Sequence, residues 1–200
     1  MTDDYLHYYD LESYLFETVR PRFRRDGKLD AFDLFSIIIW KANRAKSKLA
    51  HRLLQRQKSK NLDAVSEEFT RALFEAASAE SRLILAMDVW GFYLPMASAI
   101  LTVLWPEDFT VFDTRVCEEL ASNQTEDFSK LGNKSGKQLW LKYLQYCDAV
   151  RKAAPEHLSL RDSDRFLWGR SAARQLADDI ASGFLKPGEP SLELSRPLDQ

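Results

Sequence analysis

Apolar residues recur every three or four positions along most of this chain, the spacing that buries one face of a helix. The pattern predicts helices near residues 10–19, 30–42, 43–58, 61–79, 81–90, 139–153 and 160–184. The first should end at Arg20-Pro21 and give way to a basic loop, because proline interrupts a helix. The residues expected to face inward in the last two helices are Leu141, Tyr143, Leu144 and Val150, then Phe166, Leu167, Ala173, Leu176 and Ile180.

A different pattern follows Pro95, where apolar residues occupy nearly every position up to Leu104. A helix that is apolar all round is buried rather than amphipathic. Trp105-Pro106 should end it in a turn, since proline suits the second position of a turn. A short β-prone stretch, 109–112, then leads to Asp113, which stands at the N-cap position of a further helix. The carboxylate is therefore expected at the positive end of that helix.

Length and composition indicate one all-α unit. The chain has 200 residues, of which 45% are hydrophobic, with only seven glycines and seven prolines. We expect a single helical domain of two lobes over residues 1–184 and a disordered or loosely packed tail over 185–200. The acidic, aromatic start is unlike a signal peptide, and no apolar run is long enough to span a membrane. Cys117 and Cys147 show neither disulfide nor metal-site spacing, so we expect buried thiols in a cytoplasmic protein without metal or cofactor.

The charge is unevenly distributed. Residues 20–60 contain thirteen Lys and Arg against three Asp, a balance of +10, so the rest of the chain carries −12 against a total of −2. Within this segment Arg44, Lys48, Arg52 and Arg56 recur every fourth residue and form one ridge of a helix. Like charges at this spacing repel each other unless an anion lies opposite. Three interpretations stay open: a nucleic-acid contact, a contact with the protein's own acids, and a solvated face.

Three segments resemble one known family. Gly91-Phe-Tyr-Leu-Pro-Met-Ala97 resembles the G-x-G-x-x-x-A hairpin of the helix-hairpin-helix (HhH-GPD) DNA glycosylases, and Val111-Phe-Asp-Thr-Arg-Val116 resembles the segment that carries their catalytic aspartate. Residues 158–168 are similar to a closing helix of 8-oxoguanine DNA glycosylase-like proteins. The resemblance covers roughly residues 30–180. It implies a helix-hairpin-helix glycosylase-like bundle of about eight to ten helices, with DNA as partner and Asp113 as catalytic residue.

Two positions depart from the family pattern. Tyr93 stands where the second hairpin glycine is found, and glycine allows a backbone to approach a phosphate closely. Pro95 stands where lyase-type members carry the lysine that forms a Schiff base, and proline cannot supply that amine. Lyase activity is therefore in doubt, unless the nucleophile has moved to Lys41, next to Trp40.

The remaining candidate residues follow from these features. Gly91, Tyr93 and Arg115 are predicted to contact DNA together with the basic ridge, although Arg115 has an alternative in pairing with Glu118 or Glu119. Trp168 is a candidate for stacking on an extruded base, or a core residue. The preferred function is excision of a damaged or modified base in the bacterial cytoplasm or nucleoid, with no small-molecule ligand other than the nucleobase. The alternative is a catalytically reduced DNA-binding or protein-interaction module on the same fold, such as a bacterial defence component.

Overall fold

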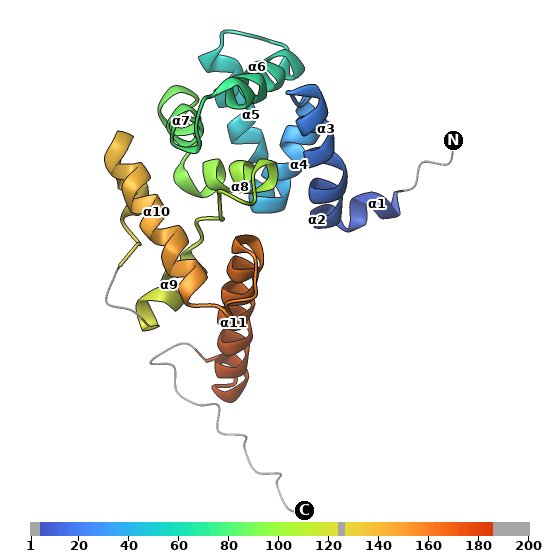
Figure 1. Ribbon diagram of the computed structural model, residues 1–200. Coiled ribbons are helices and arrows are strands. Elements are labelled where there is room, and N and C mark those ends of the chain that lie inside the picture. Colours follow the sequence, from blue (N-terminus) through green and yellow to red (C-terminus); the bar gives the residue numbers. More distant parts are fainter. Residues whose placement is uncertain (1–4, 124–126, 186–200) are drawn as a thin grey trace, which may run out of the picture.

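The computed structural model describes residues 5–123 and 127–185, and within these ranges every regular element is a helix (Figure 1). The predicted all-α class is therefore confirmed. The elements, including π-turns η1 and η3 and 3-10 turns η2 and η4, are α1 (Leu6–Tyr9), α2 (Leu11–Tyr14), η1 (Leu15–Val19), α3 (Arg20–Asp26), α4 (Ala31–Ala42), η2 (Asn43–Ala45), α5 (Lys46–Arg56), α6 (Leu62–Glu75), α7 (Ala79–Ile84), η3 (Leu85–Val89), α8 (Leu94–Leu104), α9 (Thr114–Asn123), η4 (Leu131–Asn133), α10 (Gly136–Lys152) and α11 (Leu160–Ala181).

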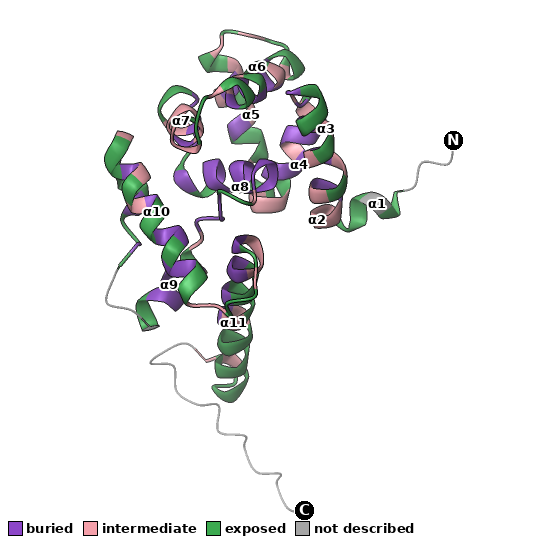
Figure 2. Cartoon of the chain, viewed as in Figure 1, coloured by how far each residue is buried: buried purple, intermediate pink, exposed green. Residues whose placement is uncertain are grey.

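The central helix is α8, which is buried at every position from Met96 to Leu104 (Figure 2). It contacts α3, α4, α7 and η3. This confirms the prediction of a buried helix after Pro95. Surrounding elements remove the apolar residues of α8 from water on all sides, which is the main favourable contribution to folding.

The stretch from Leu11 to Asp26 is continuously helical, so the predicted helix end at Arg20-Pro21 and the basic loop after it are wrong. The π-turn η1 explains the difference, because the N–H of Arg20 bonds to the carbonyl of Leu15, five residues back. Pro21 directly follows Arg20, near the point where the hydrogen-bond register changes. The helix ends instead at Gly27, whose φ is +68°. A side chain there would also meet the ring of Phe74, 3.1 Å from the added Cβ.

The next helices agree with the sequence in position and differ in part in the face they bury. In α4 the cap is Asp30, but Phe32 and Ile39 are exposed while Leu34, Ile37 and Ile38 are buried. The predicted break at Asn43 is the 3-10 turn η2. Helix α5 buries Leu49 and Leu53, and helix α6 buries Val65, Phe69 and Leu73, whereas Ala77, also expected to face inward, is exposed beyond the end of α6.

The last three helices pack on one another, with α11 against α9 and α10. In α10 the predicted inward positions Tyr143 and Val150 are buried, but Leu141 and Leu144 are exposed. The physical reason is that one narrow face of α10 meets the body, and these two leucines lie on the opposite face. Both cysteines are buried free thiols, as predicted, and burial raises the pKa of each to about 12.

The prediction for α11 fails more widely. Leu167 is buried as expected, whereas the predicted inward residues Phe166, Ala173, Leu176 and Ile180 are all exposed. The buried side of α11 instead carries polar residues along with leucines, because it faces α9 and a polar pocket. The predicted tail and its boundary after residue 184 stay a prediction, since residues 186–200 lie outside the described residues. None of the described helices is both long and apolar enough to cross a membrane.

Candidate functional site

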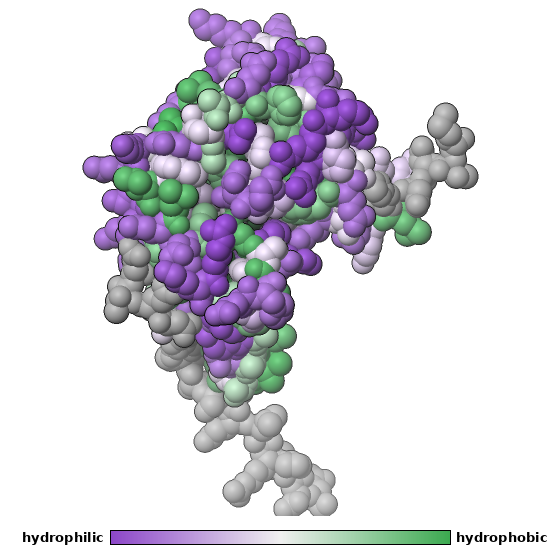
Figure 3. Space-filling model, in the orientation of Figure 1, coloured by the Kyte–Doolittle hydropathy of each residue, from purple (hydrophilic) through white to green (hydrophobic). Residues whose placement is uncertain are grey.

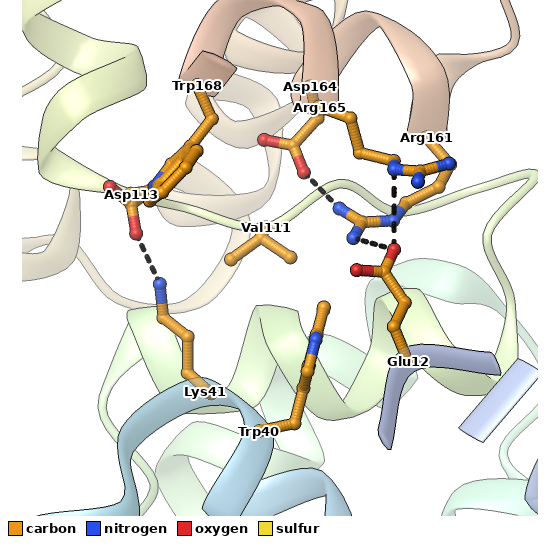
Figure 4. Close-up of a pocket in the computed structure, with 9 residues that line it drawn as sticks. All are labelled: Glu12, Trp40, Lys41, Val111, Asp113, Arg161, Asp164, Arg165 and Trp168. Carbon is orange, nitrogen blue, oxygen red and sulfur yellow. Dashed lines mark hydrogen bonds and ion pairs between the residues drawn. The ribbon is translucent and has the colours of Figure 1, made fainter. Parts of the chain in front are cut away.

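A pocket of about 390 Å³ lies where α2, α4, the stretch before α9, and α11 meet (Figure 4). This volume is within the range of small-molecule sites in proteins. The nine residues that line it are Glu12, Trp40, Lys41, Val111, Asp113, Arg161, Asp164, Arg165 and Trp168. Three of them were singled out from the sequence: Asp113, Trp168 and, as an alternative, Lys41.

Asp113 uses its two carboxylate oxygens for different purposes. Oδ1 accepts a hydrogen bond from the backbone N–H of Arg115 at 3.0 Å, which caps α9 as predicted. Oδ2 accepts a hydrogen bond from Nζ of Lys41 at 2.6 Å (Figure 4). The carboxylate is therefore fixed both by a helix N-terminus and by an ammonium group. Its side chain remains 23% exposed, so a molecule in the pocket can approach it.

The backbone before Asp113 is held by buried hydroxyl groups. The N–H of Phe112 donates to Oγ of Ser98 on α8 at 2.8 Å. From α10, the hydroxyl of Tyr146 donates to the carbonyl of Val111 at 2.9 Å, and that of Tyr143 to the carbonyl of Thr110 at 2.5 Å. These bonds pair the polar backbone groups of an extended stretch that has no strand beside it. They fix the position from which Asp113 enters the pocket.

Lys41 reaches Asp113 from the last turn of α4, which packs against α8. The two residues are 72 positions apart in the chain, and their side chains are only 15% and 23% exposed. A charge-assisted hydrogen bond is stronger where water is partly excluded. The pair thus places an amine and a carboxylate, the components of acid–base or nucleophilic chemistry, in direct contact.

Two tryptophans form aromatic walls of the pocket. Trp40 comes from α4 and Trp168 from α11, where it lies on the same side of the pocket as Asp113 (Figure 4). The guanidinium of Arg115 lies over the Trp168 ring at 5.6 Å, and that of Arg161 over the Trp40 ring at 5.1 Å. Trp168 is 47% exposed, so it is a pocket residue and not a core residue. Aromatic faces of this kind bind flat apolar or aromatic rings.

An arginine-centred cluster forms the side of the pocket opposite Lys41. Arg161 donates from Nη1 to Asp164 at 2.5 Å and from Nη2 to Glu12 at 2.7 Å. Its Nε is buried and has no hydrogen-bond partner among the described residues. Asp164 is only 3% exposed, and burial raises the pKa of its carboxyl to about 6, against the opposing effects of Arg161 and Lys41. Sequence reasoning missed this cluster because Arg161 and Glu12 are 149 residues apart.

The predicted DNA-binding residues fall into two groups. Arg52 and Arg56 lie at the hairpin: the guanidinium of Arg52 is 5.2 Å from the Tyr93 ring, and Nη2 of Arg56 donates to the carbonyl of Asp88 at 3.2 Å. Nη1 of Arg56 also lies 3.1 Å from where a Cβ on Gly91 would be, and Gly91 has φ +74°. The structure therefore joins the end of the basic ridge to the hairpin.

The other predicted residues are distributed differently. Arg44 in η2 and Lys48 in α5 are exposed earlier along the ridge. Arg115 lies at the pocket beside Trp168 rather than at the hairpin. Of its two suggested acidic partners, Glu119 is buried and accepts hydrogen bonds from Arg170 and Arg174.

Tyr93 lies in a backbone conformation that does not require glycine. Tyr93 has φ −75° and ψ 153°, an ordinary extended conformation, and its side chain is 69% exposed. Its carbonyl accepts hydrogen bonds from the N–H groups of Met96 and Ala97, which starts α8. Pro95 lies exposed in the first turn of that helix and does not line the pocket. The hairpin position thus offers no amine to the site.

The described residues contain no group of three or more His, Cys, Asp or Glu side chains arranged to hold a metal ion. A scan of protein-family models and searches of curated proteins and of solved structures give no match to this chain.

Proposed function

We propose that this chain is a DNA glycosylase-like protein that excises a damaged or modified base after the base has been extruded into the pocket. The observation that carries the proposal is the Lys41–Asp113 pair, 2.6 Å apart, in a pocket walled by Trp40 and Trp168. Enzymes that act on a base inside a duplex must flip it out and hold it against aromatic or apolar side chains. The pocket supplies such walls next to a carboxylate.

The chemistry assigned to Asp113 is stabilisation of the positive charge that develops on deoxyribose as the glycosidic bond breaks. A carboxylate fixed before the reaction by a backbone N–H and an ammonium group needs little reorganisation, which is the condition for effective electrostatic catalysis. Lys41 would hold Asp113 in this position. Lys41 is also an amine that lines the pocket, whereas Pro95, at the position of the family's lyase lysine, does not line it.

A contact surface for DNA is proposed on α5 and the hairpin. Arg52, Arg56, Gly91 and Tyr93 lie together there, and α8 connects this surface to the backbone that carries Asp113. Cations next to a backbone turn bind phosphates without reading sequence. The surface would position the duplex, and the pocket would take the base.

The proposal is tested by incubating the protein with duplexes that carry 8-oxoguanine, uracil, alkylated bases or an abasic site. Alkali-labile sites at one lesion, lost in the Asp113→Asn variant, are the expected result. A borohydride step in the same assay asks whether Lys41 acts as a nucleophile, with Lys41→Met as the control for any trapped adduct. Binding without strand change would instead support the alternative, a DNA-binding or protein-interaction module that has lost the chemistry.

If this surface on α5 and the hairpin contacts phosphates, the affinity for DNA should fall as the salt concentration rises. Each phosphate contact contributes a slope of about −0.9 to the dependence of log affinity on log salt concentration. Replacing Lys48 and Arg52 by Ala should therefore flatten the slope by nearly two, as measured by fluorescence anisotropy on one duplex. Lys152→Ala, at the far end of α10 where Lys152 pairs with Asp148, is the control and should leave the slope unchanged. An unchanged slope in the double variant would remove the ridge from the interface.

A further inference from the structure

A second basic segment lies in the part of the chain that is otherwise acidic. Residues 128–147 contain four lysines and no Asp or Glu, a balance of +4, although the chain outside residues 20–60 carries −12 in all. The lysines are Lys130, Lys134, Lys137 and Lys142. We define the lysine loop as residues 129–138, which comprise η4 and the start of α10. The loop does not line the pocket, so its charge is not explained by the site.

The cations of the lysine loop point to a partner outside the chain. Lys130, Lys134 and Lys137 are exposed, and none of the three forms an ion pair among the described residues. Asp127, the nearest acid in the sequence, uses Oδ1 to accept a hydrogen bond from the backbone N–H of Ser129 at 2.7 Å. Cations gathered on one surface without balancing carboxylates create a positive potential that attracts anions.

The lysine loop lies beside the hairpin. A Cβ added to Gly132 in η4 would be 3.8 Å from the Cβ of Leu94, the first residue of α8. Leu131, next to Gly132, is buried and anchors η4 in the body of the protein. Lys130 and Lys134 therefore flank the point where the loop meets the hairpin. Two basic segments far apart in the sequence, α5 and the lysine loop, thus both contact the hairpin.

The exposed residues of the lysine loop are of the kinds that bind phosphates. Apart from Leu131 and the half-buried Gly136, the loop exposes only Ser, Lys, Gly, Asn and Gln. Phosphate oxygens of DNA accept hydrogen bonds mainly from Lys and Arg, from Ser, Asn and Gln, and from backbone N–H groups. A protein interface needs aromatic or apolar anchors, and a membrane surface needs apolar side chains that insert. Figure 3 shows apolar surface over the free end of α11, a helix outside the loop.

We propose that the lysine loop binds phosphates of the same DNA duplex that the basic ridge and the hairpin contact. The inference rests on the proposed function, because it requires the hairpin to lie against DNA. Arg52, with its guanidinium 5.2 Å from the Tyr93 ring, supplies cations from α5, and Lys130, Lys134 and Lys137 supply them from η4 and α10. The hairpin is then one part of a longer contact with the DNA backbone.

Two matched double variants test the loop by fluorescence anisotropy. Replacing Lys134 and Lys137 by Ala removes two charges at the start of α10, and replacing Arg151 and Lys152 removes two at its end. Both variants have the same net charge, so a difference between them reports direct contacts. On an undamaged duplex of about 20 base pairs, the first should flatten the slope of log affinity against log salt by about 1.8, and the second should leave it unchanged. Adding Lys130→Ala to the first should flatten it by about 0.9 more.

A combined variant then tests whether one duplex makes both sets of contacts. With Lys48, Arg52, Lys134 and Lys137 all replaced by Ala, the slope should flatten by about 3.6, the sum of four phosphate contacts. Titration of the unchanged protein at concentrations well above Kd should saturate at one duplex per chain. Circular dichroism spectra of all variants should match that of the unchanged protein, because the replaced side chains do not belong to the core.

Three results would overturn the inference, and they separate it from the proposed function. An unchanged slope in the Lys134 and Lys137 variant, beside a flattened slope in the Lys48 and Arg52 variant, would exclude the lysine loop and leave the DNA surface on α5 standing. Saturation at two duplexes per chain would show that the loop binds a separate duplex. A protein that binds no duplex at low salt would refute the lysine loop and the proposed DNA contact together.

Discussion

Two carboxylates face the same pocket, and their positions in the fold separate their roles. Asp113 precedes α9, where a backbone N–H and Lys41 both bind it and its side chain is still 23% exposed. Asp164 lies one turn inside α11, is 3% exposed, and pairs with Arg161 at 2.5 Å. Each has a cation within hydrogen-bond distance, but only Asp113 combines a helix N-terminus with access to the pocket. Accessibility at a helix start suits a reacting group, and burial within a helix suits a group that holds its neighbour.

If the two carboxylates have different roles, the largest difference between their variants should be in the rate of base excision. Asp113→Asn should reduce the single-turnover excision rate by about 100- to 1000-fold, the loss that follows removal of one preorganised charge-stabilising group. Its stability should change by less than about 1 kcal/mol, because asparagine also caps a helix. Asp164→Asn should keep the rate within about tenfold of the unchanged protein, since Asp164 is assigned no charge to stabilise. Full activity of Asp113→Asn would mean that Asp113 only caps α9, and the proposed difference in role between Asp113 and Asp164 would be wrong.

The second effect is the pH dependence of stability. Burial raises the pKa of Asp164 from 3.8, the value of an unperturbed aspartate as in the unfolded chain, to about 6 in the folded protein. The folded state therefore binds this proton more tightly than the unfolded state does. The contribution of Asp164 to the free energy of unfolding is therefore fully present below pH 4 and is lost as the pH rises to about 6. At 1.36 kcal/mol per pKa unit the loss is roughly 3 kcal/mol.

Urea unfolding of the unchanged protein and of Asp164→Asn at pH 4 and pH 7 measures this contribution of Asp164 to the free energy of unfolding. The stability of the unchanged protein relative to the variant should fall by roughly 3 kcal/mol between the two pH values. A difference that stays constant with pH would show that the pKa of Asp164 is not raised by its burial.

The smallest of the three effects concerns Arg161. Replacing it by Met leaves Asp164 and Glu12 without their shared partner and should lower the free energy of unfolding by about 2 kcal/mol at pH 7, as for a buried polar group left without a hydrogen bond. Arg165→Met is the matched control, because Arg165 also bridges Glu12 but is 59% exposed. Exposed ion pairs contribute about 0–1 kcal/mol, so this control should unfold almost as the unchanged protein does. Equal losses in both variants would mean that burial of Arg161 adds nothing.

The features that the sequence predicted correctly depend on local signals. The cap at Asp113 and the buried helix after Pro95 each follow from residues within a few turns of one another. The hydrophobic spacing also located most helices. It failed at Pro21, which lies near a π-turn where the hydrogen-bond register changes.

The features that could not be predicted depend on long-range packing. Nothing near Lys41 indicates that its ammonium meets a carboxylate 72 residues later, and nothing near Glu12 indicates Arg161. In α11 the periodicity correctly identified an apolar face, but spacing alone cannot tell whether that face meets the protein's own core or another molecule. Phe166, Leu176 and Ile180 were placed inward for this reason.

Four of the nine pocket residues lie on α11, a helix that packs mainly against α9 and α10 and reaches α2 through ion pairs to Glu12. A local opening that releases α11 would therefore remove one tryptophan wall and the whole arginine cluster while α4, α6 and α8 stayed folded. Such sub-global openings have free energies below that of complete unfolding. The fraction of molecules with an intact pocket at any moment is then set by how firmly one helix docks, and not by the stability of the fold as a whole.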